Sequence, residues 1–276
     1  MQKLTVTATQ LEQTMLAQPV KLLRALMKNP LNPDEGNAVE GLLPDSADFD
    51  LDGAGSDHNS GLPHSMPDAS VLSAYLGRLG ISEDTAVVVY DDKGIYCAPR
   101  VWWMLKAMGH EQVTILDGGA PAWRAAGLPV DVEQPGLSLR QYSAQPQSGW
   151  FVNSSAVLAA QNTGAQIVDA RSPERFKGTA EEPRAGVRRG HIPGSVNLYY
   201  QSLLDSGQFL KETQLRSAFA QAGIDLNKPI ICTCGSGVTA CIIGVAAKML
   251  GASEVSVYDG SWSEWGADTQ YPVATA

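Results

Sequence analysis

The second half of the chain alternates short apolar runs with longer segments of helical periodicity. The apolar runs are rich in β-branched residues and predict strands at 165–170, 195–198, 229–234 and 254–259. The segments between them predict helices at 152–161, 212–223 and 239–250. Strands separated by helices form βαβ crossovers, so this half is expected to fold as a parallel sheet with helices on both faces. The first half shows the same order more faintly.

Two segments, 87–130 and 229–273, share one pattern. Each has a β-branched run, a polar loop with glycine, an apolar helical stretch, a strand that ends in Asp-Gly, and a tryptophan before a final Pro-Val. A constant spacing of 142 positions relates unlike residue types and indicates a duplicated domain: Gly109 with Gly251, Asp117 with Asp259, Gly118 with Gly260 and Trp123 with Trp265. The segment 131–150 has the composition of a linker. We therefore expect domains at 1–130 and 151–276.

Composition and charge narrow the classes of partner. The 276 residues carry a formal net charge of -9, which argues against nucleic acid or an anionic membrane as a binding partner. The N-terminal residues have no apolar stretch typical of a signal peptide, and the apolar run near 241–250 is too short to cross a bilayer. We expect a soluble cytoplasmic protein. Its four cysteines are expected as thiols, and their spacing matches no zinc site, so neither a metal nor another cofactor is predicted.

The segment IICTCGSGVTAC, residues 230–241, carries the candidate chemistry. A strand that ends at Cys234 and a helix that starts near Thr239 would place the loop at the carboxyl edge of the sheet, where open α/β sheets bind ligands. Gly235 and Gly237 permit a tight turn that points N–H groups inward. The helix N-terminus adds partial positive charge there. These features favour a thiolate at Cys234 and charge on a bound sulfur.

The other cysteines have different settings. Cys232 lies inside the apolar strand, and Cys241 follows the start of the helix, so both are interpreted as packing residues. In the first half of the chain, aligning the two loops places Asp91 where the second half has Cys234, and Cys97 falls after the loop. The first domain is therefore expected to be non-catalytic.

Three motifs together resemble the two-domain rhodanese family: CGSGVTA at 234–240, EEPRAGVRRGHIPGSVN at 181–197 and YDGSWSEWG at 258–266. The first-domain segments 48–67 and 88–105 resemble it as well. The resemblance implies an α/β fold of two tandem rhodanese-like domains, each a parallel sheet flanked by helices, with the active site at the domain interface. It implies a sulfurtransferase whose cysteine takes sulfur from a small-molecule donor as a persulfide and passes it to cyanide, a thiol or thioredoxin.

The residues after Cys234 bear on the identity of the donor. The loop resembles that of the 3-mercaptopyruvate sulfurtransferases, whereas relatives that use thiosulfate have basic residues where this chain has Gly235 and Ser236. Mercaptopyruvate is therefore the expected donor and pyruvate the product. Thiosulfate is the alternative, and an inactive regulatory module is a further one that the intact Cys234 loop argues against. A cysteine phosphatase would need an arginine at the position of Ala240.

The resemblance also implies roles for individual residues. Arg184 matches the carboxylate-binding arginine, for which a bidentate guanidinium is suited. Some relatives have a second substrate arginine where this chain has Pro193, and either Arg188 or Arg189 could replace it. Ser236 is expected to hold the carbonyl oxygen of the leaving pyruvate or the thiol proton. The predicted catalytic residues are Cys234, Ser236, Asp52 and His64, and the predicted substrate-binding residues are Arg184, Arg188, Arg189, Gly235, Gly237, Val238 and Thr239.

Overall fold

The computed structural model describes residues 3–28, 41–133, 136–160 and 163–275. The chain divides into two compact units. Unit 1 consists of Met1–Asp57, Met66–Gln147 and Ser206–Phe209, and unit 2 consists of His58–Ser65, Ser148–Asp205 and Leu210–Ala276. Each unit thus includes one short segment from the other half of the sequence, and the segment His58–Ser65 contains the predicted site residue His64.

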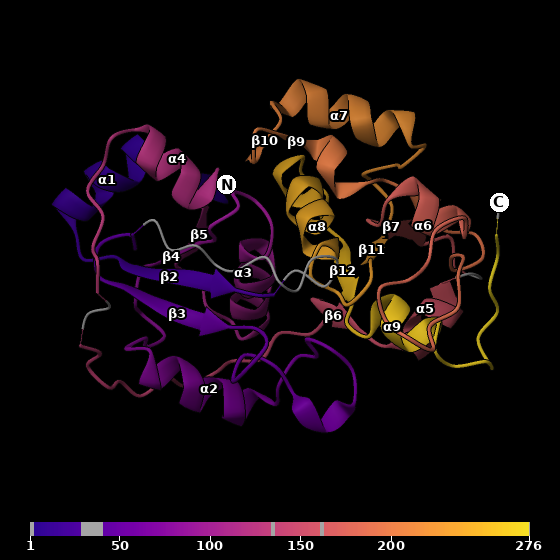
Figure 1. Cartoon of the computed structure of the whole chain (residues 1–276), viewed down its shortest axis with the longest axis horizontal. Coiled ribbons are helices and arrows are strands. Elements are labelled where there is room, and N and C mark those ends of the chain that lie inside the picture. The colour runs from indigo at the N-terminus through magenta and orange to yellow at the C-terminus, as the bar shows by residue number, and fades with distance from the viewer. Residues whose placement is uncertain (1–2, 29–40, 134–135, 161–162, 276) are drawn as a thin grey trace. The chain divides into compact units, whose positions relative to one another are not determined.

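Unit 1 is a parallel five-stranded sheet with helices on both faces. Its strands are β1 (Thr5–Val6), β2 (Lys21–Leu26), β3 (Ser46–Asp50), β4 (Val87–Tyr90) and β5 (Val113–Leu116), in the order β1-β5-β4-β2-β3. Its helices are α1 (Ala8–Ala17), α2 (Ala69–Arg78), α3 (Ala98–Ala107) and α4 (Gly119–Ala125). Figure 1 shows α1 and α4 on one side of the sheet and α2 on the other.

Unit 2 repeats this arrangement. Its sheet contains β6 (Phe151–Val152), β7 (Gln166–Asp169), β8 (Val196–Asn197), β11 (Ile230–Thr233) and β12 (Val255–Tyr258), all parallel, in the order β6-β12-β11-β7-β8. Its helices are α5 (Ser154–Ala160), α6 (Pro173–Lys177), α7 (Glu212–Gln221), α8 (Ala240–Met249) and α9 (Ser261–Trp265). Short 3₁₀ turns at His58–Ser60 (η1) and Tyr200–Leu203 (η2) and a two-stranded sheet of β9 (Leu204–Asp205) and β10 (Gln208–Phe209) complete the elements.

These two sheets confirm the predicted fold class, and the strands and helices predicted for the second half are present with slightly shorter bounds. The equal strand order of the two sheets agrees with a duplication. β4 and β11 are the equivalent central strands, because each is third in its sheet. The residue that follows either strand lies at the carboxyl edge of its sheet.

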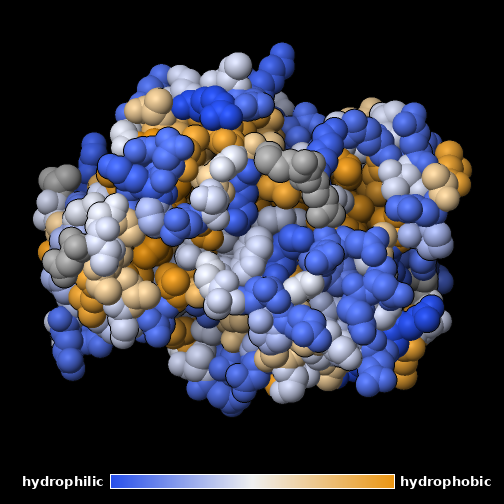
Figure 2. Space-filling view, turned by 180° about the vertical axis from the view of Figure 1, so that it is seen from behind, coloured by the Kyte–Doolittle hydropathy of each residue, from blue (hydrophilic) through white to orange (hydrophobic). Residues whose placement is uncertain are grey.

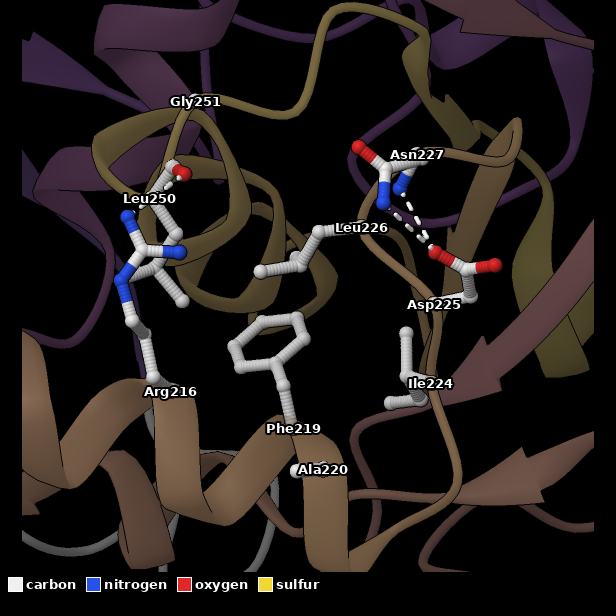
Figure 3. A pocket seen from close by; sticks show the side chains of 9 residues that line it. All are labelled: Arg216, Phe219, Ala220, Ile224, Asp225, Leu226, Asn227, Leu250 and Gly251. Carbon is white, nitrogen blue, oxygen red and sulfur yellow. Dashed lines mark hydrogen bonds between the residues drawn. The ribbon is translucent and has the colours of Figure 1, made fainter.

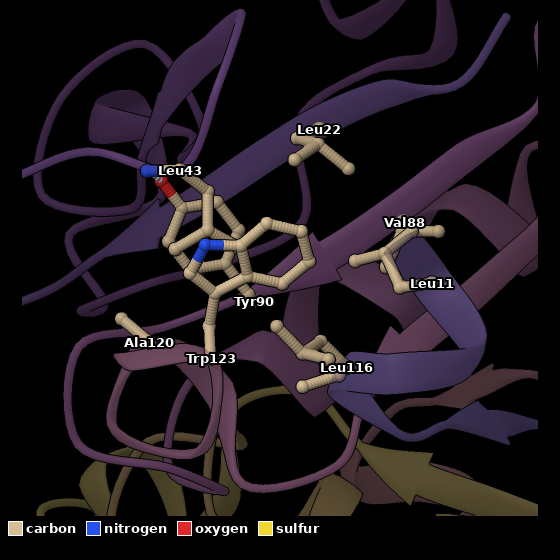
Figure 4. Packing of buried hydrophobic residues seen from close by; sticks show 9 residues of the cluster. Leu11, Leu22, Leu43, Val88, Tyr90, Leu116, Ala120 and Trp123 are labelled. Carbon is tan, nitrogen blue, oxygen red and sulfur yellow. Dashed lines mark hydrogen bonds between the residues drawn. The ribbon is translucent and has the colours of Figure 1, made fainter. Parts of the chain in front are cut away.

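A buried tryptophan stabilises the same face of each sheet. In unit 1, Trp123 of α4 packs with apolar residues of α1 and the sheet, such as Leu22 and Val88 (Figure 4), and its indole N–H donates to the carbonyl of Pro129 at 2.8 Å. In unit 2, Trp265 of α9 lies in the corresponding cluster and donates to the carbonyl of Pro272 at 2.7 Å. The repeated Trp and Pro-Val positions of the sequence therefore make the same packing contact in both units.

Leu16, Val132 and Leu139 are the most exposed large apolar residues in the described ranges, and Val132 and Leu139 both belong to the segment 131–150. Figure 2 shows one face on which hydrophobic residues are interspersed with hydrophilic ones. Among the described residues, no helix has the length and apolar character needed to span a bilayer.

Candidate active site

Cys234 is the first residue after the central strand of unit 2. The preceding strand β11 pairs with β7 on one side and β12 on the other, so Cys234 lies between two neighbouring strand ends at the carboxyl edge. The loop 234–239 then leads into α8, as the sequence predicts. The Cys234 side chain is 2% exposed and forms no disulfide.

Helix α9 holds the main chain of this loop in place. The N–H of Cys234 donates to Ser261 Oγ at 3.2 Å, and its carbonyl accepts the N–H of Trp262 at 3.0 Å. The carbonyl of Gly235 accepts both the N–H and the hydroxyl of Ser263, at 2.8 and 2.6 Å. Ser261 has a φ of 49°, a left-handed conformation that non-glycine residues adopt only where the surrounding structure enforces it. The thiol is therefore presented from a rigid loop.

The rest of the loop offers main-chain donors. Gly237 has a φ of 73°, which permits the tight turn that the sequence predicts. Among the described residues, the N–H groups of Gly235, Ser236, Val238 and Thr239 donate to no protein acceptor. Together with the N-terminus of α8, these donors form a region of positive potential beside the thiol, suited to a group whose negative charge develops on sulfur.

Two guanidinium groups lie above Gly235. A Cβ atom at this position would be 3.2 Å from Arg175 Nη2 and 3.9 Å from Arg184 Nη1, so a glycine leaves the space that these groups occupy. Arg184 is a predicted site residue, whereas Arg175 was missed. Arg175 belongs to α6, which follows β7, the strand next to β11. That adjacency is a property of the folded sheet, so no local sequence signal pointed to Arg175.

A carboxylate holds Arg175 in this place. Glu182 is 4% exposed in its side chain and accepts hydrogen bonds from Arg175 Nη2 at 2.5 Å and Nε at 3.2 Å. It also accepts from Arg171 Nη1 at 2.9 Å, and Arg171 in turn pairs with Asp169 at 2.6 Å. Burial alone would lower the pKa of Arg171, but the carboxylates of Asp169 and Glu182 raise it above its usual value. The cluster is a charged network that orients Arg175 toward the loop.

Ser236 forms a pair with His64. The Nδ1 atom of His64 lies 2.9 Å from Ser236 Oγ, and both residues are 7% exposed. His64 has a φ of 59°, so its backbone is also held in a left-handed conformation. The structure thus brings His64, which is far away in the sequence, to the loop that contains Cys234. A hydroxyl bonded to an imidazole can accept and return a proton.

Three other predicted site residues have different surroundings. Asp52 is exposed in unit 1, where its carboxylate accepts the N–H of Lys28 at 2.6 Å. Arg189 is about half exposed and forms an ion pair with Glu181. Arg188 folds onto the segment that follows α9, where its guanidinium donates to the main-chain carbonyls of Trp265, Gly266, Asp268 and Tyr271.

The remaining cysteines are buried thiols. Burial raises the pKa of Cys232 far above its usual value, and the neighbouring Cys241 and Cys234 raise it further. Cys241 is fully buried and donates to the carbonyl of Gly237 at 3.2 Å. Burial and two nearby carboxylates likewise raise the pKa of Cys97 in unit 1. These settings match the interpretation of Cys232 and Cys241 as packing residues.

A pocket of about 310 Å³ in unit 2 lies away from this site. It is enclosed by α7, the turn at 224–227 and the end of α8, and hence lies at the amino edge of β11 (Figure 3). Arg216 on its rim is already bonded to Glu212 and to the carbonyl of Leu250, and Asp225 is bonded to Asn227. No predicted site residue lines this pocket, so the candidate active site is the loop at the carboxyl edge.

The chain belongs to the family of proteins with rhodanese-like domains, because residues 43–126 and 154–268 both match that family. It is 42% identical over 257 residues to 3-mercaptopyruvate sulfurtransferase of Mus musculus, covering 90% of this chain and 86% of the relative. It is 40% identical to thiosulfate/3-mercaptopyruvate sulfurtransferase 1, mitochondrial, of Arabidopsis thaliana, covering 84% and 67%.

Solved structures agree with this placement. The 3-mercaptopyruvate sulfotransferase SseA of Escherichia coli matches with a TM-score of 0.83 and 34% sequence identity, covering 95% of this chain and 99% of that chain. The family and the fold expected from the motifs are therefore confirmed.

Proposed function

We propose that this protein is a sulfurtransferase that takes a sulfur atom from 3-mercaptopyruvate onto Cys234 as a persulfide and releases pyruvate. The observation that carries the proposal is the convergence on one loop of a free thiol, main-chain donors, two guanidinium groups and the Ser236–His64 pair. Relatives similar over most of the chain carry the name of this activity.

In the first half-reaction the Cys234 thiolate attacks the sulfur of the donor. A sulfur–sulfur bond forms, the sulfur–carbon bond breaks, and its electron pair remains on the three-carbon fragment as the enolate of pyruvate. The donor thiol loses one proton and the enolate carbon gains one. Ser236 and His64 are the groups that move this proton, since their hydrogen bond links a hydroxyl to an imidazole.

Arg175 and Arg184 bind the carboxylate of the donor. Guanidinium groups form bidentate, charge-assisted bonds with carboxylates, and two of them offset the negative net charge of the protein locally. Arg175 thereby supplies the second arginine that the sequence leaves open, while Arg188 stabilises the segment that follows α9 and Arg189 forms an exposed ion pair. The role of Asp52 in proton transfer stays a prediction that rests on the resemblance.

In the second half-reaction the terminal sulfur of the persulfide passes to an acceptor and the Cys234 thiolate is regenerated. We propose a thiol acceptor such as thioredoxin, with cyanide as a simple substitute. Thiosulfate is the second candidate donor, because a relative named for both donors matches the chain. Its leaving group, sulfite, needs no proton, so the Ser236–His64 pair favours mercaptopyruvate.

Mass spectrometry tests this proposal directly. After incubation with mercaptopyruvate, one sulfur of about 32 Da should appear on the peptide that contains Cys234, with one pyruvate released per sulfur. The Cys234→Ser variant should gain none, whereas the matched Cys241→Ser variant should keep the adduct. Sulfur on Cys232 or Cys241 in the wild-type protein, or no adduct at all, contradicts the mechanism.

A further inference from the structure

Two consecutive carbonyl groups of the loop 234–239 are held by helix α9. The carbonyl of Cys234 accepts the N–H of Trp262 at 3.0 Å. The carbonyl of Gly235 accepts the N–H of Ser263 at 2.8 Å, and the hydroxyl of the same serine donates to it at 2.6 Å. Because a carbonyl oxygen has two lone pairs, Ser263 alone occupies both acceptor positions of this carbonyl.

These bonds determine where the N–H groups of the loop point. The peptides that follow Cys234 and Gly235 are trans, and in a planar trans peptide the carbonyl and the N–H point in opposite directions. Since both carbonyls are directed at α9, the N–H groups of Gly235 and Ser236 are directed away from it. Neither N–H donates to an acceptor among the described residues. Helix α9 therefore fixes the direction of two donors without bonding to them.

The N–H of Cys234 does not belong to this set of donors. It donates to Ser261 Oγ at 3.2 Å, and the hydroxyl of Ser261 donates in turn to the carbonyl of Tyr258 at 2.8 Å. The two serines of α9 thus act differently on the loop. Ser261 accepts one N–H of the loop and so removes it as a donor for a ligand, whereas Ser263 bonds to a carbonyl and leaves the N–H of Ser236 available.

We infer that Ser263 is a positioning residue for sulfur transfer. Its two bonds to the carbonyl of Gly235 hold the N–H of Ser236 toward the sulfur at Cys234, where this N–H stabilises negative charge. Donors that are fixed in advance stabilise a developing charge better than mobile ones, because they need not reorient during the reaction. Ser263 itself contacts neither the donor nor the reacting sulfur in this mechanism. The inference rests on the proposed function and deepens it.

The test compares the full-length Ser263→Ala protein with wild type and with Ser195→Ala. Ser195 is a matched control, because its N–H and its hydroxyl also donate to one carbonyl, that of Ile192, at 3.0 and 2.6 Å. It precedes β8 and hence lies at the amino edge of the sheet, away from Cys234. Both variants lose one bond from a hydroxyl to a carbonyl and keep the main-chain bond. Both should therefore fold, with similar small decreases in melting temperature.

The first turnover with mercaptopyruvate separates positioning from stability. Rapid mixing with excess donor gives the maximal rate of pyruvate release and the donor concentration at half that rate. In Ser263→Ala the maximal rate should fall about tenfold, less than the loss of about 100-fold or more on removing such a donor outright, because the N–H of Ser236 is loosened but still present. The half-saturating concentration should not change, since Arg175 and Arg184 bind the carboxylate. An unchanged maximal rate, or a loss equal to that of Ser195→Ala, overturns the inference.

Alkylation of Cys234 by iodoacetamide is a second measurement that needs no sulfur donor. The thiolate is the form that reacts, and the same main-chain donors stabilise its charge. At neutral pH, Ser263→Ala should be alkylated about threefold more slowly than wild type and Ser195→Ala; the effect is less than tenfold because a less stabilised thiolate is also a stronger nucleophile. Equal rates in the three proteins overturn the inference. If wild type releases no pyruvate but Ser263→Ala is alkylated more slowly, the proposed function fails and the orienting role of Ser263 stands.

Discussion

Glu182 connects the buried charge network to the catalytic loop, and its replacement by glutamine separates substrate positioning from general stability. Both oxygens of Glu182 accept hydrogen bonds from Arg175, and one also accepts from Arg171. Glutamine has one acceptor oxygen, and its amide would point N–H groups at a guanidinium. In Glu182→Gln, Arg175 therefore loses a charge-assisted bond and its fixed orientation beside Gly235.

The magnitude follows from the burial of the groups. Removing one partner of a buried ion pair costs about 3–5 kcal/mol. Arg171 keeps Asp169, and the Arg175 side chain is 15% exposed and can reach water, so we expect the lower end, about 3 kcal/mol. That corresponds to a fall in melting temperature of about 6–12 °C. Loss of one guanidinium contact with the donor carboxylate, about 1.5–3 kcal/mol, raises KM for mercaptopyruvate about 10- to 150-fold.

Thermal melts and steady-state release of pyruvate measure both effects. Glu181→Gln is the matched control, because Glu181 is the adjacent residue, its side chain is 78% exposed, and its only ion-pair partner among the described residues is a half-exposed arginine. We expect it to change stability by less than about 0.5 kcal/mol and to leave KM unaltered. The reasoning is refuted if Glu182→Gln behaves like Glu181→Gln, or if kcat falls while KM stays constant.

Three further changes test other parts of the structure. Arg188→Ala removes the hydrogen-bond donor of four main-chain carbonyls, so it should lower the melting temperature by several degrees without changing KM. The control Arg189→Ala should change neither the melting temperature nor KM. A tenfold rise in KM for Arg188→Ala would show that Arg188 binds the substrate. Ser236→Ala and His64→Gln should each lower kcat about 100-fold with mercaptopyruvate. With thiosulfate the loss should be less than about tenfold, because its leaving group takes no proton. Equal losses of kcat with the two donors would contradict the proton-transfer role. Burial raises the pKa of Asp91 to about 6, so between about pH 4 and 6 the folded chain holds a proton that the unfolded chain has released. The stability of wild type relative to Asp91→Ala should fall by about 3 kcal/mol as the pH rises through this window and stay constant above pH 7, and a constant difference throughout would refute it.

Local patterns were sufficient to predict most elements of unit 2. Strands such as Ile230–Thr233 are buried on both faces and appear as continuous apolar runs, and α8 has enough turns to show its periodicity. The strand β6 and the short helices α6 and α9 were not predicted, because two to five residues are too few to show a period. Their positions depend on pairing and packing with distant parts of the chain.

The same distinction applies to the site. Cys234 and Ser236 lie in one loop with a local pattern, so the sequence alone could propose them as candidates. Arg175 was missed because its role depends on the adjacency of β7 and β11, which local sequence does not reveal. Arg188 looked equally suitable as a cation near the motif, but its guanidinium is bound by carbonyls at 265–271, a contact between segments far apart in the chain.

The two equivalent loops differ in how the main-chain donors at the carboxyl edge of each sheet are satisfied. A loop that turns several N–H groups toward one point needs an acceptor there, because each buried donor left without one costs about 1–3 kcal/mol. In unit 1, Asp91 supplies that acceptor permanently through four hydrogen bonds. In unit 2, Cys234 stands at the same position, and the donors of Gly235, Ser236, Val238 and Thr239 have no acceptor among the described residues. In the reaction that we propose, an anionic sulfur at Cys234 would provide this acceptor, and the donors would stabilise its negative charge.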